Sequence, residues 1–530
     1  MIRARIALGL FFSIILCSAP SAQTPATHAL TPGEAHATHA FSEAKKMGPG
    51  ELYALLEPMP KGADLHMHLS GAVYAETFLA EGVQQALCVD PLALKFTQPV
   101  AHNETAACAI GSVPAATILK DEHLYDALVD AFSMRSFVPT SGFSGHDQFF
   151  STFDRFGGLK DYSGQWLNEV ATRAAAQNEQ YLEIMMTPPF SKAAALGYKL
   201  GWPLGADKNA NRDQLAKLRD QLLAGGLRDE ITADSKQIVD AKLVRDSMEG
   251  CNAKNVATPS ACTIKIHFLY QILRAFPPQQ VFAQTLLGFE TASADPNFVG
   301  INFVQPEDDR IAMQDYHLQM LMLDYLHSVY PNVRISLHAG ELAPGLVPPA
   351  GLSFHIREAI DLGHASRIGH GVDVLYEDDA PALLKEMAAK HIMVEINLTS
   401  NEGILGVKGK EHPLAAYRAA HVPVALSTDD EGVSRIDLTH EYVKGAEDQN
   451  LTYVDLKQMA RTSLEHAFLR GESLWAAPDD FARRKPACAA PITATSTPTT
   501  SCAKLLQSSE RASEQWELEH RFAIFEGSIH

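Results

Sequence analysis

Eight short apolar segments, separated by longer amphipathic stretches, constrain the fold most. We predict that they are β-strands, at residues 63–68, 181–187, 263–268, 298–303, 334–338, 367–371, 392–396 and 423–427. Helical patterns lie between them, for example at 311–329, 353–362 and 380–390. Strands that alternate with helices form parallel sheets, and eight such units favour a closed barrel. The predicted fold class is therefore α/β, a (β/α)8 barrel of TIM type with helical insertions.

Two insertions interrupt this repeat, at about residues 82–156 and 188–261. Near the end of the first, five phenylalanines recur at near-helical spacing: Phe143, Phe149, Phe150, Phe153 and Phe156. We expect them in the core, and an apolar lid over a site is the alternative. The second insertion is polar and helical at 211–223 and 234–249. We expect it on the exterior or rim of the barrel.

The N-terminal segment, residues 1–22, has the features of a secretory signal peptide. Arg3 and Arg5 precede an apolar run over 6–17, and small residues follow. A lipid anchor on Cys17 is the alternative, but no small residue comes just before that cysteine. We therefore predict an exported protein, periplasmic or secreted. No later stretch is long and apolar enough for a membrane span.

The rest of the chain divides into three predicted parts. Residues 23–57 form an N-terminal arm, helical over 40–56, and residues 58–475 form the barrel with its insertions. Residues 476–530 form a C-terminal extension that is rich in Pro, Thr and Ser before a final helix at 508–522. We expect this helix to pack back on the barrel.

Six cysteines remain besides Cys17, and they fall in three close pairs. An even number in an exported chain indicates disulfides. We predict the pairs Cys88–Cys108, Cys251–Cys262 and Cys488–Cys502. A cysteine-held zinc ion is disfavoured, because the chain has no Cys-x-x-Cys.

The composition, 46% hydrophobic and 20% charged, is typical of a globular enzyme. A net charge of −19 without a basic cluster argues against a nucleic-acid or anionic-membrane partner. The sequence leaves the oligomeric state open, a dimer included.

Two histidines end the first predicted strand. His66 and His68 are separated by one residue, so they lie on the same face of the strand and can share a metal ion. An isolated His-x-His is more often a structural or surface pair. Later strand ends supply the other groups that a metal site would need. We therefore favour metal binding here over a structural or surface pair.

Three later strands also end in polar residues. The fifth leads through His338 to Glu341, the sixth ends at His370 between two glycines, and the eighth leads to Asp429 and Asp430. In a barrel of parallel strands these ends meet at one mouth. A carboxyl group near a metal-activated water is suited to proton transfer. Two adjacent aspartates point different ways, so one can reach a metal and the other a substrate.

These segments together resemble the adenosine deaminase family of metal-dependent amidohydrolase barrels. The matching pieces are the run from Met59 to Gly71 (MPKGADLHMHLSG), His338-Ala-Gly-Glu341, Gly369-His-Gly371, Leu398-Thr-Ser-Asn401 with His412-Pro413, and Ser427-Thr-Asp-Asp430. They occur in order between about residues 58 and 474. Export, disulfides and the Met59-Pro-Lys-Gly opening are also similar to the secreted adenosine deaminase-like growth factors, although the N-terminal arm is short for their dimerising domain.

The resemblance implies one Zn²⁺ per chain and a purine nucleoside as substrate. The zinc ligands would be His66, His68, His338 and Asp429. His370 would take a proton from the attacking water, Glu341 would protonate ring nitrogen N1, and Asp430 would bind N7 or its neighbour. The implied reaction is hydrolytic deamination of adenosine or deoxyadenosine to inosine or deoxyinosine and ammonia.

Three positions depart from the family pattern. Ser70 stands where many relatives have an acidic residue that binds the ribose 5′-hydroxyl, and Gln305 stands where a glycine N–H meets the purine. Glu431 replaces the usual proline after the Asp-Asp pair, which we interpret as a loop change. The first two make adenine or a 5′-modified adenosine an alternative substrate.

Other classes of function fit less well. An extracellular binding or signalling protein with vestigial catalysis would not be expected to keep every residue of the predicted site. An amidohydrolase acting on an ester or amide often needs a second metal and a modified lysine, and no strand end offers that lysine. The cysteine-based deaminase signature is also absent.

Overall fold

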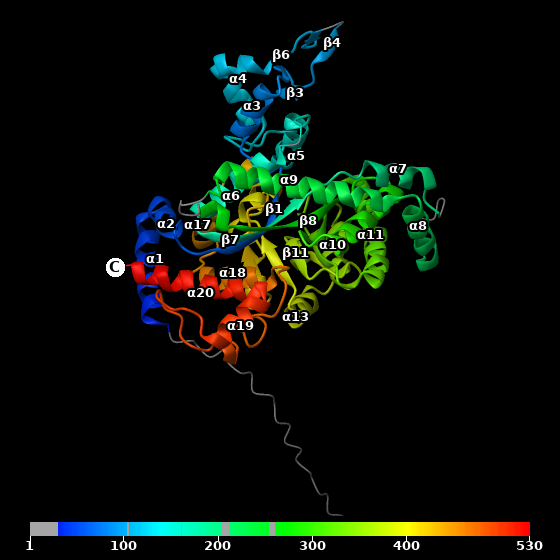
Figure 1. The fold of residues 1–530 in the computed structure, drawn as a ribbon. Helices are drawn as coiled ribbons and strands as arrows, with labels where there is room; N and C mark the ends of the chain where they lie inside the picture. Colours follow the sequence, from blue (N-terminus) through cyan, green and yellow to red (C-terminus); the bar gives the residue numbers. More distant parts are fainter. Residues whose placement is uncertain (1–29, 103–104, 161, 204–210, 254–259, 530) are drawn as a thin grey trace, which may run out of the picture.

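The predicted barrel is confirmed by a computed structural model, which describes residues 30–529 apart from 103–104, 161, 204–210 and 254–259 (Figure 1). The predicted signal peptide lies outside the described residues. The parallel strands are, in order, β1 (Gly62–His68), β7 (Glu179–Met186), β8 (Lys265–Leu273), β9 (Phe298–Val304), β10 (Arg334–Ala339), β11 (Arg367–His370), β12 (Met393–Ile396) and β13 (Val424–Leu426). The first and last meet through a bridge between Met67 and Asp429.

Seven of these strands lie within two residues of their predicted bounds, and β8 differs. It continues past its predicted end at Phe268 to Leu273, paired with β9 along this length. The sequence obscures the extension because Gln271 interrupts an apolar run. This amide lies in the cavity at the mouth of the barrel.

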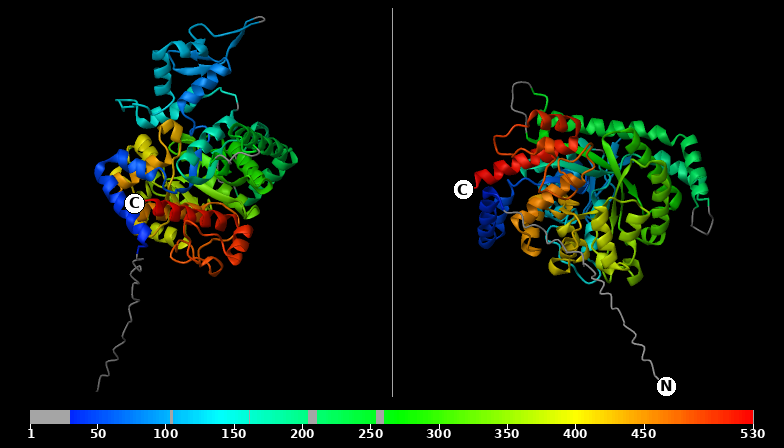
Figure 2. Two further views of the ribbon diagram at one scale, coloured as in Figure 1. Left: turned by 60° about the vertical axis from the view of Figure 1, so that its left-hand side comes forward. Right: turned by 90° about the horizontal axis from the view of Figure 1, so that it is seen from below.

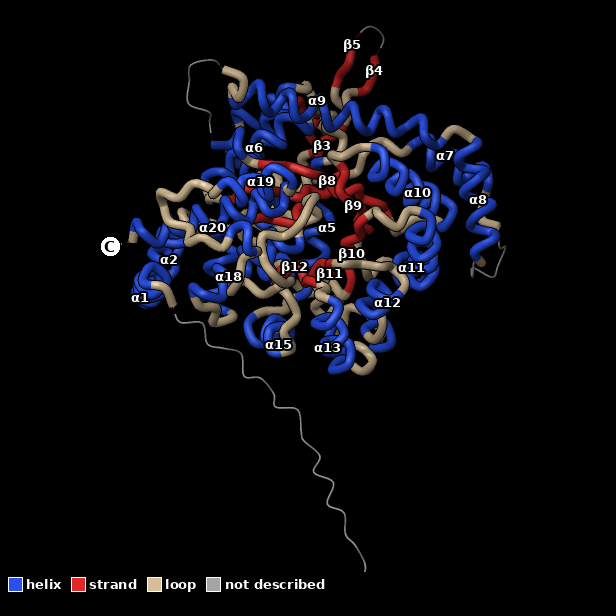
Figure 3. Tube along the Cα trace, turned by 60° about the horizontal axis from the view of Figure 1, so that its bottom comes forward, coloured by secondary structure: helices blue, strands red, loops and turns tan. Residues whose placement is uncertain are grey.

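Helices surround the barrel in the order expected of alternating units (Figures 2 and 3). They include α6 (Ser163–Ala176), α10 (Pro278–Ala294), α11 (Arg310–Val329), α12 (His355–Asp361), α13 (Ala380–Lys390), α14 (Leu398–Leu405), α15 (Leu414–Ala419), α16 (Glu431–Ser434), α17 (Leu438–Asp448) and α18 (Tyr453–His466). Local sequence sets several starts. At α11 the Asp309 carboxylate accepts from the N–H groups of Ile311 and Ala312, which leaves fewer unpaired donors in the first turn.

The two ends of the described chain lie together (Figure 1). They comprise α1 (Pro32–Met47), α2 (Pro49–Leu56), α19 (Thr500–Ser508) and α20 (Glu510–Ser528). Of these helices, α1 and α20 pack against α18. Lys457 of α18 pairs with Glu34 of α1 at 2.9 Å and Glu526 of α20 at 2.5 Å. The predicted arm helix starts earlier, at Pro32, and is broken at Gly48 before Pro49. The predicted packing of the final helix on the barrel is confirmed.

The first insertion forms a lobe that stands off the barrel (Figure 1). Its elements are α3 (Ala75–Gln84), α4 (Glu122–Ala131) and the short strands β2 (Cys88–Asp90), β3 (Lys95–Thr97), β4 (Val100–His102), β5 (Thr105–Ala107) and β6 (Val113–Pro114). Helix α5 (Gly145–Phe156) lies between the lobe and the barrel. Phe149 and Phe156 are buried in the core of the lobe, as predicted, but Phe143 is exposed.

The second insertion contains α7 (Ser191–Leu200), α8 (Arg212–Ala224) and α9 (Ile231–Glu249), so its two predicted helices are confirmed. All three predicted disulfides are formed: Cys88–Cys108, Cys251–Cys262 and Cys488–Cys502. Within the described ranges, the search for a membrane-spanning helix found none of sufficient length and hydropathy.

Candidate active site

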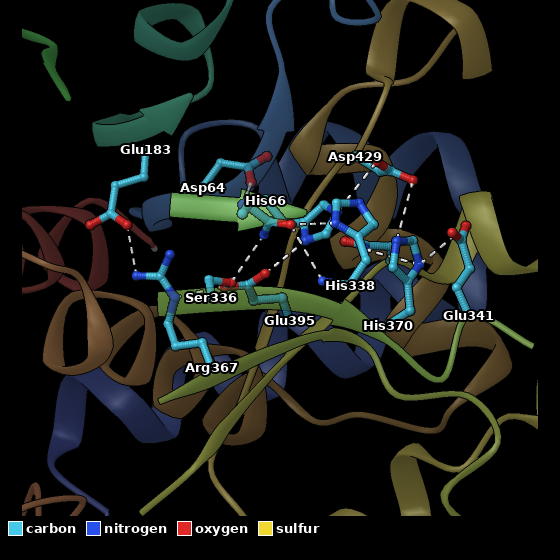
Figure 4. A network of polar contacts seen from close by, with 12 residues as sticks. Asp64, His66, Glu183, Ser336, His338, Glu341, Arg367, His370, Glu395 and Asp429 are labelled. Carbon is cyan, nitrogen blue, oxygen red and sulfur yellow. Dashed lines mark hydrogen bonds and ion pairs between the residues drawn. The ribbon is translucent and has the colours of Figure 1, made fainter. Parts of the chain in front are cut away.

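Side chains predicted for the metal site converge at the carboxyl ends of the barrel strands (Figure 4). His66 and His68 come from β1, His338 from β10, and Asp429 from the turn after β13. One nitrogen or carboxylate oxygen of each lies within 4.8 Å of those of the other three. All but His68 are almost fully buried, and His68 is 12% exposed.

Three of the six distances between these atoms match the spacing of tetrahedral ligands around a divalent ion. Nε2 of His68 lies 3.3 Å from Nε2 of His338 and 3.2 Å from Oδ1 of Asp429, and Nε2 of His66 lies 3.5 Å from the same oxygen. Metal–ligand bonds of about 2.0–2.2 Å place tetrahedral ligands about 3.3–3.6 Å apart. Nε2 of His66 is buried and has no hydrogen-bond partner in the described part of the chain. The residues therefore fit a metal ion.

Outer partners set the orientation of each imidazole. Nδ1–H of His66 donates to Glu395 at 2.7 Å, and Nδ1–H of His338 donates to Asn302 at 2.7 Å. The side-chain amide of Gln271 contacts Nδ1 of His68. In His66 and His338, a proton held on Nδ1 leaves the Nε2 lone pair free for a metal, as is usual around metal-binding histidines.

Glu395 is itself held in a buried ionic chain (Figure 4). Its other oxygen accepts from Arg367 at 2.6 Å and from Ser336 at 2.9 Å, and Arg367 pairs with Glu183 at 2.7 Å. Burial raises the pKa of Glu395, but Arg367 and His66 outweigh it and lower the pKa to about 2. The carboxylate is therefore ionised and faces His66, a predicted metal ligand.

Glu341 lies beside the cluster and, unlike those of Glu395, its surroundings favour the protonated form. Burial, Asp429 and Glu307 raise its pKa well above the usual range, which favours the protonated form. Glu307 fixes the loop by accepting from the N–H groups of Gly340 at 3.1 Å and Glu341 at 2.8 Å. The side chain of Glu341 can therefore donate a proton.

His370 ends β11 and is fully buried. Its Nε2 lies 3.9 Å from Oδ2 of Asp429, and Asn401 contacts its Nδ1 at 2.9 Å. Burial lowers the pKa of His370 to about 3, which keeps the ring neutral. His370, Asp429 and Gln305 all have left-handed φ angles, of 68°, 59° and 84°. Strained backbone of this kind gathers at active sites.

A cavity of about 260 Å³ opens beside these groups. The predicted substrate residues Ser70, Gln305 and Asp430 line it, together with His68, Glu341 and three phenylalanines of α5: Phe149, Phe150 and Phe153. The phenylalanines thus serve both as core and as a cover over the site. The side chain of Gln305 turns to Ala275 and accepts its N–H at 2.9 Å. The contact of its backbone with a purine remains a prediction.

Gly71 and Glu431 shape the junction between the first and last strands. A Cβ atom on Gly71 would lie 1.4 Å from Oδ1 of Asp430, so the glycine makes room for that carboxylate. Glu431 pairs with Arg173 of α6 at 2.6 Å, and Arg173 also donates to the carbonyl of Ala72. Arg173 therefore links the loop that follows β1 to the loop that follows β13, and the latter carries Asp429.

Sequence reasoning missed the outer partners of the site. A polar residue inside an otherwise apolar predicted strand was the available signal, as for Glu395 in 392–396 and Asn302 in 298–303. Gln271 gave no signal, because it lay beyond the predicted end of its strand.

A sequence model described as adenosine deaminase matches residues 216–476. Over 140 residues the chain is 35% identical to an adenosine deaminase of Clostridium perfringens, and over 139 residues 37% identical to one of Shewanella loihica. The sequence model covers just under half of the chain, and it and these relatives support assignment to the adenosine deaminase family. Each alignment covers 26% of this chain and 39% of the relative, so the chain spans well under half the length of these curated relatives. The matches do not single out the growth-factor branch.

Two solved structures match most of the chain at low identity. An adenine deaminase from Arthrobacter aurescens is 14% identical, with a TM-score of 0.49 over 77% of this chain and 94% of that one. The N6-methyl-AMP deaminase of Arabidopsis thaliana is 18% identical, with a TM-score of 0.48 over 79% of this chain and 94% of that one.

Proposed function

We propose that this protein is a Zn²⁺-dependent deaminase that hydrolyses the 6-amino group of adenosine or deoxyadenosine. The observation that carries the proposal is the meeting of three imidazole nitrogens and one carboxylate within 4.8 Å of one another, beside the buried carboxyl group of Glu341. Three nitrogen ligands and one oxygen suit zinc. The curated relatives named above are adenosine deaminases, which supports the same chemistry here.

The roles of the residues follow from their positions. A bound Zn²⁺ would lower the pKa of a water molecule to about 7 and so provide a nucleophile at neutral pH. Glu341 would donate its proton to a ring nitrogen of the purine, which makes the neighbouring carbon electrophilic. Asp430, buried and with one oxygen unpaired among the described residues, would bind another ring nitrogen. His370 would contact the attacking water.

The cavity favours an uncharged substrate. The residues that line it include Phe149, Phe150, Phe153, Leu273 and Val304, and none of them is a lysine or arginine. A nucleotide phosphate normally needs such a cation or a cluster of backbone N–H groups. We therefore favour a nucleoside over a nucleotide. Adenine or a 5′-modified adenosine on the same site is the alternative.

A purine panel tests the proposal. The zinc-loaded protein should release ammonia from adenosine and deoxyadenosine at least 100-fold more efficiently than from AMP, and a chelator should abolish the activity until zinc is restored. Adenine and a 5′-thioether of adenosine, assayed in parallel, separate the alternatives. Preference for AMP, or no ammonia from any 6-aminopurine, would refute the proposal.

We also infer export of the mature protein. Three disulfides within the described residues support an oxidising compartment. The predicted signal peptide at residues 1–22 points the same way. Fractionation of the native host tests this inference, and enzyme confined to the reducing cytoplasm would contradict it.

A further inference from the structure

His370 is the last member of a buried chain of hydrogen bonds that has a fixed direction. The chain begins at the backbone of Leu414, whose N–H donates to Nδ1 of His412 at 3.2 Å. Nε2 of His412 contacts Oδ1 of Asn401 at 3.0 Å, and the Asn401 amide nitrogen contacts Nδ1 of His370 at 2.9 Å. Asn401 is fully buried and His412 is 2% exposed.

The direction follows from the first donor. A backbone N–H can only donate, so Nδ1 of His412 accepts and its proton lies on Nε2. This N–H donates to the oxygen of Asn401, and the amide NH₂ therefore faces His370. A flipped Asn401 would set its NH₂ against the N–H of His412, two donors face to face. Nδ1 of His370 thus accepts, and its proton lies on Nε2.

The surroundings of His370 agree with this assignment. A second amide nitrogen, of Asn397, lies 3.4 Å from the same Nδ1. Nε2 has no hydrogen-bond partner in the part of the chain that the structure describes; Oδ2 of Asp429 lies 3.9 Å from it, and Oε1 of Glu341 lies 3.7 Å from Nδ1. The Nε2–H of His370 is therefore unpaired beside the predicted metal ligands.

We propose that Asn401 and His412 are positioning residues that hold His370 in the Nε2–H form, so that it offers a hydrogen-bond donor to the attacking oxygen. This inference rests on the proposed function and changes one part of it. The resemblance assigns His370 as the group that takes the proton of the water, which would require a free lone pair on Nε2. With a donor there, the water would lose its proton to solvent on binding the metal, and the Nε2–H would stabilise the negative charge on the oxygen; the loss of one such donor typically costs about 10²–10³ in kcat.

Two variants reverse the direction of these hydrogen bonds while keeping a polar side chain at the substituted position. In Asn401→Asp the carboxylate can only accept, so Nδ1 of His370 must carry a proton. In His412→Glu the new acceptor turns the amide of Asn401, and its oxygen then faces His370. The matched control is His412→Gln, because a glutamine NH₂ still donates to Asn401 and keeps the original direction. We expect kcat to fall about 100-fold in the two reversing variants and by less than fivefold in the control, with KM changed little in all three.

The decisive readout is the protonation of the two ring nitrogens of His370, measured by nitrogen NMR. Zinc-loaded full-length protein labelled with [¹⁵N]histidine is used, and the signals are assigned by their loss in His370→Gln. We expect an unprotonated Nδ1 and a protonated Nε2 in the native protein and in His412→Gln, and a protonated Nδ1 in Asn401→Asp. A protonated Nδ1 in the native protein would overturn the proposal. If the protein deaminates no purine, the NMR result still decides the tautomer, so the two failures are distinguishable.

Discussion

Replacing Glu395 by glutamine tests how much a hydrogen-bond partner of a predicted metal-binding histidine contributes to metal binding. All three groups around this carboxylate are donors: Nδ1–H of His66 at one oxygen, and Arg367 and Ser336 at the other. Glutamine has one oxygen and one NH₂, so one side must set two donors against each other. No rotation of the amide satisfies both sides.

Each orientation of the glutamine has a cost that the structure defines. With the NH₂ toward His66, the ring keeps its partner only by moving its proton to Nε2, which removes a metal ligand. With the NH₂ toward Arg367, the buried guanidinium loses one of its two carboxylates and keeps Glu183 alone. An unsatisfied buried group costs about 1–3 kcal/mol. Loss of an outer-shell partner weakens metal binding about 10–100-fold, or about 1.4–2.7 kcal/mol.

The assay is zinc affinity, measured by competition with a chromogenic chelator, alongside thermal unfolding of the metal-free protein. The matched control is Glu519→Gln on α20. It removes a buried carboxylate whose two oxygens accept hydrogen bonds from Arg461 of α18 at 2.6 and 2.8 Å. The control should lower the melting temperature and leave zinc affinity unchanged. Zinc affinity within twofold of wild type in Glu395→Gln would refute the reasoning.

Three further predictions concern catalysis, substrate binding and pH. Glu341→Gln should lower kcat about 10²–10⁴-fold with zinc content unchanged, and activity near wild type would show that Glu341 is not the proton donor. Phe150→Ala removes part of the apolar wall and should raise KM about tenfold, for a loss of about 1–2 kcal/mol, with kcat within a few-fold; an unchanged KM would place the substrate elsewhere. Burial raises the pKa of Glu34, but Lys457 outweighs it and lowers the pKa from 4.5 to about 2. This depressed pKa stabilises the fold above pH 4.5, and the contribution disappears as the pH falls through about 2. Urea unfolding at pH 6 and pH 3 should show a smaller loss of stability in Glu34→Gln than in the native chain, and equal losses would contradict the ion pair.

The barrel could be predicted from the sequence because apolar strands follow simple periodic rules, whereas the set of metal ligands was predicted from the resemblance to the adenosine deaminase family. The sequence was insufficient for segments too short to show a period and for features that depend on contacts between residues distant in sequence. The lobe's short strands, such as Cys88–Asp90, are too brief to show a period of two. The need for Gly71 becomes visible only when Asp430 lies against it. The direction of the hydrogen bonds that run from Leu414 to His370 depends on contacts between side chains distant in sequence.

The most direct test of the central claim is anomalous diffraction at the zinc absorption edge from crystals of the zinc-loaded protein. We predict one strong peak about 2.0–2.2 Å from Nε2 of His66, His68 and His338 and from a carboxylate oxygen of Asp429. A peak elsewhere, or none at this cluster, would contradict the account.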